Sequence, residues 1–200
     1  MLAKKLQGSH LTLVPEIKQN AKFLIPWLKD KTVMRFVDHE GFGYSLKEEV
    51  ADLKFVKKHD WSELHYIIFD EDKKPVGAAG LELNEFHKSG EIWLLIGEKS
   101  AWGKGYGQEC IQILGDYFFN KLKYNRLELA VSKEFTKGVL AYKKAGFKVE
   151  GVIRKAEWDM FGKKFRDQVL MSILKEEWNN KKINAKRHSF GGLRTISERK

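Results

Sequence analysis

The chain has 200 residues, of which 42% are hydrophobic, and this is enough for one compact domain with a real core but scarcely for two. Its 37 basic and 27 acidic residues give a net charge of +10, a value that can indicate a nucleic-acid partner. Seven basic residues and one acidic residue follow position 177, so +6 belongs to the end of the chain and only +4 to the rest. The modest charge of the body argues against nucleic-acid binding as the main function.

Three other classes of protein are disfavoured by the same sequence. Cys110 is the single cysteine, which excludes an intramolecular disulfide, and it lies on an apolar helical face where a small core residue is expected. The six histidines form no i, i+4 pair and have no cysteine partners at zinc spacing, so we expect no metal. No charge-free apolar run approaches the roughly 18 residues that span a membrane, and the N-terminus resembles no secretory signal. We therefore expect a soluble, cytoplasmic protein.

The first half of the chain predicts a strand, helical segments and a hairpin. Apolar and β-branched residues predict a strand over 10–14, and helical spacing predicts helices over 18–28, 31–37 and 46–58. Pro26 complicates the first of these helices, because proline ends or kinks a helix. A glycine- and aromatic-rich connector covers 38–44. Strands over 64–69 and 76–83 flank a turn at 70–75, which predicts a hairpin.

The second half alternates between strands and helices. A short apolar strand over 91–96 leads through a glycine loop into a long helix that begins near position 106. Further strands are predicted over 126–131, 147–158 and 165–174, with a helix over 136–144. The fold class is α/β, in the α+β sense: a mixed, mostly antiparallel sheet with helices on both faces. Beyond position 178 the chain is polar and basic, so residues 179–200 are expected to form a flexible tail.

The glycine loop predicts a binding site for an anion. Gly103, Gly105 and Gly107 lack a Cβ, so the backbone can turn tightly and point several N–H groups outward beside the positive end of the following helix. A P-loop needs Gly-x-x-x-x-Gly-Lys-Ser/Thr, and a dinucleotide fold needs Gly-x-Gly-x-x-Gly early in a repeating strand-helix pattern. Neither spacing is present, so the ligand is a phosphate-bearing molecule of another class.

The loop resembles the acetyl-CoA signature of the GNAT superfamily of N-acetyltransferases, Arg/Gln-x-x-Gly-x-Gly/Ala. Gly105 and Gly107 occupy the two small positions, while Trp102 stands where the signature has Arg or Gln. The sequence Trp-Gly-Lys-Gly-Tyr is similar to the version in the RimJ/RimL-like enzymes, which acetylate ribosomal proteins. A second motif resembles the family at 141–147, where a helix carrying Tyr142 ends at Gly-Phe. The element order matches the GNAT fold over about residues 9–176.

The resemblance implies one acetyltransferase domain over residues 1–178 and acetyl-CoA as the cosubstrate, without a metal. Backbone amides of the loop would provide most of the pyrophosphate contacts. The residues expected to bind the cofactor are Leu95, Ile96, Trp102, Gly103, Lys104, Gly105, Tyr106, Gly107 and Lys144.

The implied chemistry needs a base and an acid. An alkyl amine with a pKa near 10 is mostly protonated at neutral pH, so a base must remove its proton before it attacks the thioester. Glu91 is the first candidate and Glu82 on the preceding strand the second. Tyr142 matches the family's tyrosine, which would protonate the leaving sulfur. The Asn that often precedes this tyrosine by seven residues is here Phe135.

The acceptor stays open at this point. A RimJ/RimL-like enzyme implies a primary amine such as a protein N-terminus, with the basic tail available for a ribosome or RNA contact. The alternatives are a small-molecule acetyltransferase for a polyamine, aminosugar or aminoglycoside, an inactive acetyl-CoA-binding module, and a nucleic-acid-associated protein. In this fold the early helices and the last hairpin shape the acceptor site, and acidic and aromatic groups there suit a cationic amine. The residues concerned are Asp38, Glu40, Glu157 and Asp159, with Phe42, Tyr44, Trp158 and Phe161.

Overall fold

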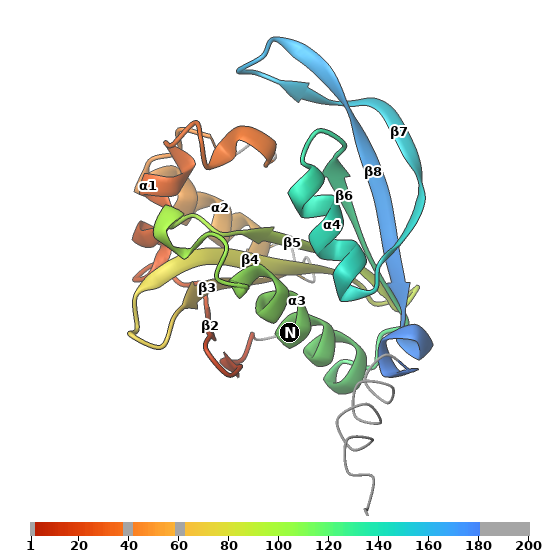
Figure 1. Cartoon of the computed structure of the whole chain (residues 1–200). Coiled ribbons are helices and arrows are strands. Elements are labelled where there is room, and N and C mark those ends of the chain that lie inside the picture. The colour runs from red at the N-terminus through yellow and green to blue at the C-terminus, as the bar shows by residue number, and fades with distance from the viewer. Residues whose placement is uncertain (1–2, 38–41, 59–62, 181–200) are drawn as a thin grey trace, which may run out of the picture.

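A single mixed sheet with helices on both faces forms the centre of the computed structural model, which describes residues 3–37, 42–58 and 63–180 (Figure 1). The strands are β1 (Leu6–Gln7), β2 (Thr12–Pro15), β3 (Glu63–Phe69), β4 (Pro75–Asn84), β5 (Ser89–Leu95), β6 (Arg126–Ser132), β7 (Lys148–Asp159) and β8 (Lys164–Leu174). Their order in the sheet is β1-β2-β3-β4-β5-β6-β8-β7, and only β5 and β6 are parallel neighbours. The predicted mixed, mostly antiparallel sheet is confirmed.

Helices cover the sheet on two sides, and each side has its own core. The helical segments are η1 (Ala21–Phe23), α1 (Ile25–Leu28), η2 (Met34–Phe36), α2 (Leu46–Lys58), η3 (Lys99–Ala101), α3 (Tyr106–Asp116), the π-helical turn η4 (Tyr117–Lys121), α4 (Thr136–Ala145) and a last helix at 175–180. Buried side chains of α3 pack with strand residues such as Leu81 and Ile92. A second cluster joins Trp27 and Met34 to Leu95 on the other face.

The hairpin of β3 and β4 shows why the two faces differ. Side chains alternate along a strand, so Leu64 and Tyr66 enter the core under α3, while Ile67 enters the core under α1. The turn at 70–75 and the antiparallel register, with Ile67 opposite Ala78, confirm the predicted hairpin. Alternate residues of one strand therefore face different sides of the sheet.

Two predicted helices near the N-terminus are wrong. Instead of a helix over 18–28, the chain forms the turn η1 and the four-residue α1, with Pro26 in the first turn of α1. Proline lacks an N–H and is tolerated there, so it starts a new helix rather than continuing the old one. The segment 31–37 contains only η2. The two-residue β1 was not predicted, and residues 38–41 of the predicted connector lie outside the described residues.

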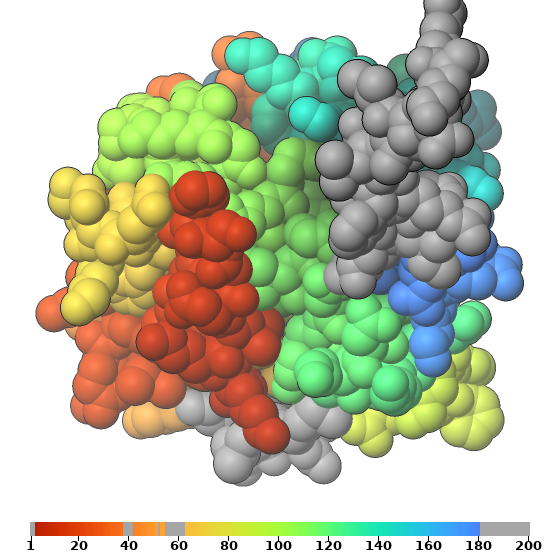
Figure 2. Space-filling view, turned by 60° about the horizontal axis from the view of Figure 1, so that its bottom comes forward, coloured from red at the N-terminus to blue at the C-terminus, as the bar shows by residue number. Residues whose placement is uncertain are grey.

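Both ends of the described chain pack against α3. The N-terminal segment, red in Figure 2, lies beside α3, and the N–H groups of His10 and Leu11 donate to Glu109 Oε1 at 2.7 and 3.1 Å. Near the other end Trp178 is only 2% exposed, and its Nε1 donates to Asp116 Oδ1 at 2.8 Å. The helix that carries Trp178 continues to residue 180, two residues beyond the predicted boundary, and the predicted tail from 181 lies outside the described residues.

Candidate active site

The site is built around a split in the sheet between β5 and β6. In these two strands pairing covers only Ser89, Gly90 and Glu91 against Arg126, Leu127 and Glu128. Beyond those pairs β5 continues to Leu95 and β6 to Ser132 without pairing to each other, and Figure 1 shows the two strands diverging. We call the opening beyond Glu91 and Glu128 the fork. Because the two strands separate there, side chains from both faces of the sheet can approach one another.

The glycine loop lies between β5 and α3. Gly103 and Gly105 have φ angles of +81° and +84°, in the left-handed region that side chains rarely adopt, so glycine is required there. A Cβ at either position would meet no atom within 4 Å, so the loop surface is open. The first amides of α3 have no helical acceptors of their own and point beyond the helix end. Open space, exposed amides and the positive helix end fit the pyrophosphate of acetyl-CoA.

Trp102 takes a different role from the Arg or Gln that it replaces. Its indole Nε1 donates to the carbonyl of Ile96 at 2.7 Å, so the side chain ties the start of the loop to the end of β5. The loop is thereby held in place without a polar contact to the phosphates. Leu95, also predicted to contact the cofactor, buries its side chain with Trp27 on the other face, so only its backbone can face the cofactor.

The remaining predicted cofactor residues occupy the N-terminal end of α3 and the C-terminal end of α4. Tyr106 and Gly107 form the first turn of α3, Lys104 lies exposed in the loop, and Lys144 lies exposed in the last turn of α4. Sequence reasoning missed Gln108, whose Nε2 donates to the carbonyl of Ala141 at 2.5 Å. This bond joins α3 to α4. It depends on a contact between helices, so the spacing of residues gave no signal for it.

Tyr142 is placed as the family motif implies. Gly146, with a φ of +104°, ends α4 in the left-handed region, and this turn sends Phe147 into the core. The ring of Tyr142 is half-buried, 5.7 Å from the ring of Phe147. Burial, the Cys110 thiol and the Glu91 carboxylate raise the pKa of Tyr142. Its hydroxyl therefore keeps its proton at neutral pH and can donate it.

Glu91 lies at the base of the fork. It is directly opposite Glu82 on β4 and Glu128 on β6. The residue is exposed as a whole, yet partial desolvation of the carboxyl group, together with the charges of Glu82 and Glu128, raises the pKa of Glu91. A hydrogen bond from the N–H of Ala130 opposes this shift. The structure thus brings both predicted catalytic groups to the fork, close enough for Glu91 to influence Tyr142.

The two groups approach the fork from opposite faces. Leu81 and Ile92, which neighbour Glu82 and Glu91 in sequence, pack in the core under α3. Because side chains alternate, Glu82 and Glu91 face away from α3. On the β6 side Glu128 pairs with Arg126, whose Nη2 lies 2.6 Å from Glu128 Oε2 and 2.6 Å from Glu150 Oε2. An acyl donor held by the glycine loop on the α3 face can therefore meet an amine that comes from the acidic face.

Two of the acidic residues expected to attract the amine have another role. Asp159 and Glu157 form ion pairs with Arg166, whose side chain is 3% exposed, and Asp159 itself is buried. Burial alone would raise the pKa of Asp159, but hydrogen bonds from the backbone of Gly162 and Phe161, with the charge of Arg166, hold it below its ordinary value. Asp159 is thus an ionised structural partner of Arg166. Asp38 and Glu40 lie outside the described residues.

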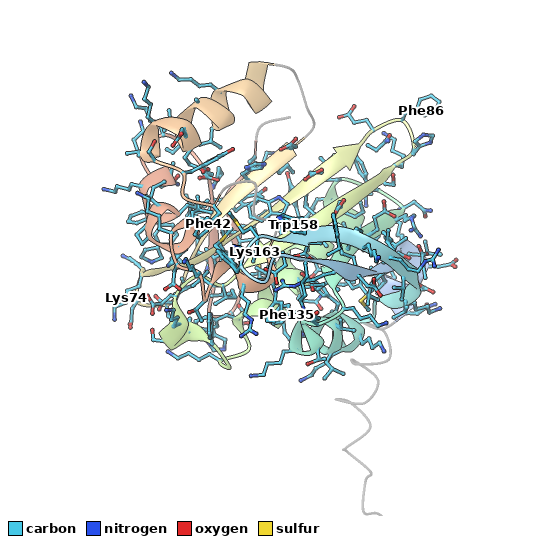
Figure 3. All side chains as sticks on the ribbon, turned by 90° about the horizontal axis from the view of Figure 1, so that it is seen from above. Phe42, Lys74, Phe86, Phe135, Trp158 and Lys163 are labelled. Atoms are coloured by element: carbon cyan, nitrogen blue, oxygen red, sulfur yellow. The ribbon has the colours of Figure 1, made fainter. Side chains whose placement is uncertain are left out.

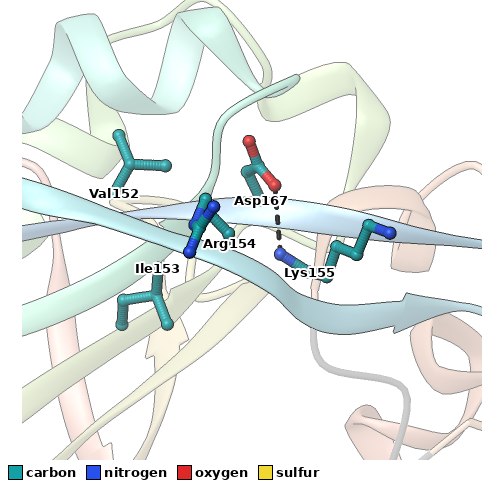
Figure 4. A pocket seen from close by; sticks show the side chains of 5 residues that line it. All are labelled: Val152, Ile153, Arg154, Lys155 and Asp167. Atoms are coloured by element: carbon teal, nitrogen blue, oxygen red, sulfur yellow. Dashed lines mark hydrogen bonds between the residues drawn. The ribbon is translucent and has the colours of Figure 1, made fainter.

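A pocket at the outer strand of the sheet is not part of this site. It is lined by Val152, Ile153, Arg154, Lys155 and Asp167, where β7 bulges and the N–H of Lys155 donates to Asp167 Oδ1 at 3.0 Å (Figure 4). The lining strands β7 and β8 lie on the far side of β6 from β5. The fork and the loop, rather than this pocket, hold the predicted chemistry.

The part of the chain that the structure describes contains neither a metal site nor a membrane-spanning helix. Among these residues, no group of three or more His, Cys, Asp or Glu side chains is arranged to hold a metal ion. No helix in the same part of the chain is both long and apolar enough to cross a membrane.

The fold and the open glycine loop together fit an acyltransferase that uses a phosphate-bearing acyl donor. A family model described as an acetyltransferase (GNAT) domain matches residues 10–148. The chain belongs to this family, and it is an N-acetyltransferase that uses acetyl-CoA.

The names of similar proteins indicate a class of acceptor, which the family model does not. The chain is 26% identical over 175 residues to the spermidine N(1)-acetyltransferase of Escherichia coli, covering 88% of this chain and 86% of that protein. It is 30% identical over 176 residues to the uncharacterized N-acetyltransferase p20 of Bacillus licheniformis, covering 86% and 97%. The structure of a spermidine N-acetyltransferase from Vibrio cholerae in complex with CoA and spermine matches with a TM-score of 0.76 at 26% identity, covering 86% and 99%. The predicted superfamily is confirmed, but the relatives named here do not specifically support the RimJ/RimL-like branch.

Proposed function

We propose that the protein acetylates a primary amine of a polyamine. The observation that carries this proposal is the pair of carboxylates, Glu82 and Glu91, placed directly opposite each other beside the fork on the face away from α3. The similarity to spermidine acetyltransferases from two bacteria supports the same acceptor. A polyamine was one of the alternatives left open by the sequence. It accounts for both the pair of carboxylates and the similarity to spermidine acetyltransferases, whereas a protein N-terminus accounts for neither.

The physical argument rests on like charges. Two carboxylates directly opposite on neighbouring strands repel each other, and this repulsion destabilises the sheet. Burial is the main cause of the raised pKa of Glu91, and the charge of Glu82 adds to it. A ligand with two positive charges placed beside the pair would reduce this repulsion. Amines separated by three carbons lie about 5 Å apart in an extended chain, by bond lengths near 1.5 Å, and neighbouring strands lie about 4.8 Å apart.

The roles of the side chains follow from their positions. Acetyl-CoA supplies an activated acetyl thioester, and the amides of the glycine loop and of the first turn of α3 would hold its pyrophosphate. Glu91 accepts the proton that the ammonium group must lose before it can act as a nucleophile, directly or through water. Tyr142 keeps its hydroxyl proton at neutral pH and donates it to the leaving sulfur. Glu82 holds the second positive charge of the acceptor.

The other acceptors make different demands on this site. A protein N-terminus carries a single ammonium group, so it would relieve only one of the two carboxylates. An aminosugar or aminoglycoside carries several amines, but on rigid rings with many hydroxyl groups that need hydrogen-bond partners. The proposed ribosome or RNA contact of the tail, the flexibility of residues 179–200, the one-domain boundary at 178 and the cytoplasmic location stay predictions.

The test is an amine panel with the purified protein and acetyl-CoA. Release of CoA is followed with spermidine, spermine, 1,3-diaminopropane, propylamine, kanamycin and a peptide with a free N-terminus. We expect the polyamines to give the highest kcat/KM and propylamine a much lower one. Glu82→Gln should reduce kcat/KM for the polyamines about fivefold and leave propylamine unaffected, a loss that corresponds to one modest ion pair. Glu85→Gln, in the exposed turn between β4 and β5, is the matched control.

A higher kcat/KM for the peptide than for spermidine would contradict the proposal and favour the RimJ/RimL-like interpretation. Equal effects of Glu82→Gln on spermidine and propylamine would remove Glu82 from recognition of the second charge.

A further inference from the structure

Phe135 forms a contact that its family counterpart cannot form. It precedes α4 and stacks on Phe36 of η2, with ring centroids 5.1 Å apart and an angle of 10° between the rings. Gly138, one turn into α4, makes room for this ring, because a Cβ there would lie 2.6 Å from Phe135 Cε1. The Asn that the family often has here has no aromatic face to stack. Phe36 and Gly138 therefore accommodate the aromatic ring that stands in place of the family's Asn.

Arg166 of β8 completes the contact. Its guanidinium lies over the ring of Phe36, 5.2 Å from the centroid, and its Nη1 donates to the carbonyl of Arg35 at 2.6 Å. The buried ion pair with Asp159 fixes the guanidinium in turn. Three segments far apart in sequence thus meet at Phe36. We call Phe36, Phe135 and Arg166 the clasp.

The hairpin of β7 and β8 makes a further aromatic contact with the N-terminal part of the chain. Phe161 at its tip meets Phe42 edge to face, with ring centroids 5.0 Å apart. Seen from above in Figure 3, Phe42 lies next to Lys163, which is two residues beyond Phe161 in the same hairpin, in agreement with this ring contact.

The clasp joins the ends of the two strands that diverge. Phe135 follows β6 directly, and its N–H donates to the carbonyl of Ser132, the last residue of β6, at 2.9 Å. On the other side Met34 of η2 packs in the same core cluster as Leu95, the last residue of β5. The fork is therefore held at its base by the three paired residues of each strand and across its open end by the clasp.

We propose that the clasp positions Glu91 and Tyr142 relative to each other, which makes Phe36 and Phe135 positioning residues for the acetyl transfer. Glu91 belongs to β5, and Tyr142 to α4, the helix that Phe135 directly precedes. Glu91 is held in the paired base of the fork, whereas α4 follows the end of β6 that does not pair with β5. The position of Tyr142 relative to Glu91 therefore depends on the contact of α4 with α3, through Gln108, and on the clasp. A misplacement of about 1 Å can reduce the rate of a reaction a hundredfold, so a bridge here acts on the chemical step.

The test compares five variants by kinetics with acetyl-CoA and spermidine: Phe135→Asn, Phe135→Tyr, Phe36→Leu, a double variant and a control. Phe135→Asn, which restores the family residue, should lower kcat about tenfold while both KM values stay within about twofold, because the proposed clasp acts on the chemical step rather than on binding. Phe135→Tyr keeps the aromatic face and should restore kcat. The double variant Phe36→Leu with Phe135→Asn should be no slower than the slower single variant, since both changes break one contact. Leu140→Asn, on the exposed face of α4, is the control.

A second measurement does not need spermidine to react. Amide hydrogen exchange should speed up at residues 34–37 in Phe135→Asn and remain unchanged there in Leu140→Asn, although both substitutions lie about a hundred positions away in sequence. Unchanged exchange at 34–37 in Phe135→Asn would overturn the proposal. A wild-type kcat for Phe135→Asn, or a failure of Phe135→Tyr to restore kcat, would overturn it as well. A protein that shows the expected exchange but does not acetylate spermidine would contradict the proposed acceptor and leave the clasp intact.

Discussion

Replacing Glu91 by glutamine should have two opposite effects, on activity and on stability. The amide keeps the shape of the side chain and loses the base, so at neutral pH turnover should fall about a hundredfold, the lower end of the range for general-base catalysis. Raising the pH toward about 9 should restore part of the rate, because the amine, with a pKa near 10, then supplies its own deprotonated form. The loss should appear in kcat rather than in the KM for acetyl-CoA.

The effect on stability follows from the raised pKa of Glu91. A carboxyl group whose pKa is higher in the folded state lowers stability as the pH rises from the unfolded value through the folded value. At pH 7 the charge therefore costs stability, and glutamine removes that cost. Repulsion between opposite strand residues amounts to roughly 0.2–1 kcal/mol, and solvent screening at this exposed residue favours the lower part of that range. For a domain of this size, the melting temperature should rise by at most about 2–4 °C.

The assay combines a pH–rate profile with thermal unfolding at about pH 7 and about pH 4. The gain in melting temperature should be present at the higher pH and disappear at the lower one, where the wild-type carboxyl group is largely protonated in both states. Glu85→Gln controls for the loss of a negative charge from the surface. A Glu91→Gln variant whose pH–rate profile overlays that of the wild type would refute Glu91 as the base and promote Glu82.

Three further predictions address the cofactor loop, the acid and the end of the chain. Gly105→Val should weaken acetyl-CoA binding at least tenfold by calorimetry, because a β-branched residue resists a φ of +84°; equal affinity in a folded variant would move the cofactor site elsewhere. Tyr142→Phe should keep acetyl-CoA affinity within a few-fold and lower kcat by about ten- to a thousandfold, and an unchanged kcat would leave Tyr142 as packing. Deleting 181–200 should leave the melting temperature unchanged, whereas Trp178→Ala should lower stability by about 3 kcal/mol; a large loss on deletion would show that the tail packs on the domain.

The parts of the fold that depend on local pattern were predictable from sequence. The hairpin of β3 and β4, the helix α2 and the strand-loop-helix around Gly105 all follow from periodicity and turn residues, and their predicted positions agree with the structure within a few residues. The predictions of secondary structure failed where a single residue overrides the hydrophobic periodicity. Pro26 starts a short helix instead of bending a long one. The helix at 175–180 was not predicted, because it depends on the contact of Trp178 with α3, which periodicity cannot show.

Some residues of the candidate site could likewise be predicted from the sequence, and others could not. Gly105 and Tyr142 carry sequence motifs, so they could be found directly. Glu91 could be named, but its position opposite Glu82 and Glu128 depends on strand register, which follows from the assembled sheet. Asp159 was misinterpreted as a group for the acceptor, because only the folded hairpin shows that it pairs with Arg166.

A crystal structure with CoA and spermidine bound together would test the central claim most directly. We expect the CoA sulfur to lie in the fork near the Tyr142 hydroxyl, a primary ammonium group to lie beside Glu91, and the next ammonium group to lie beside Glu82. Spermidine bound on the α3 face, or away from Glu91 and Glu82 altogether, would contradict the proposed function.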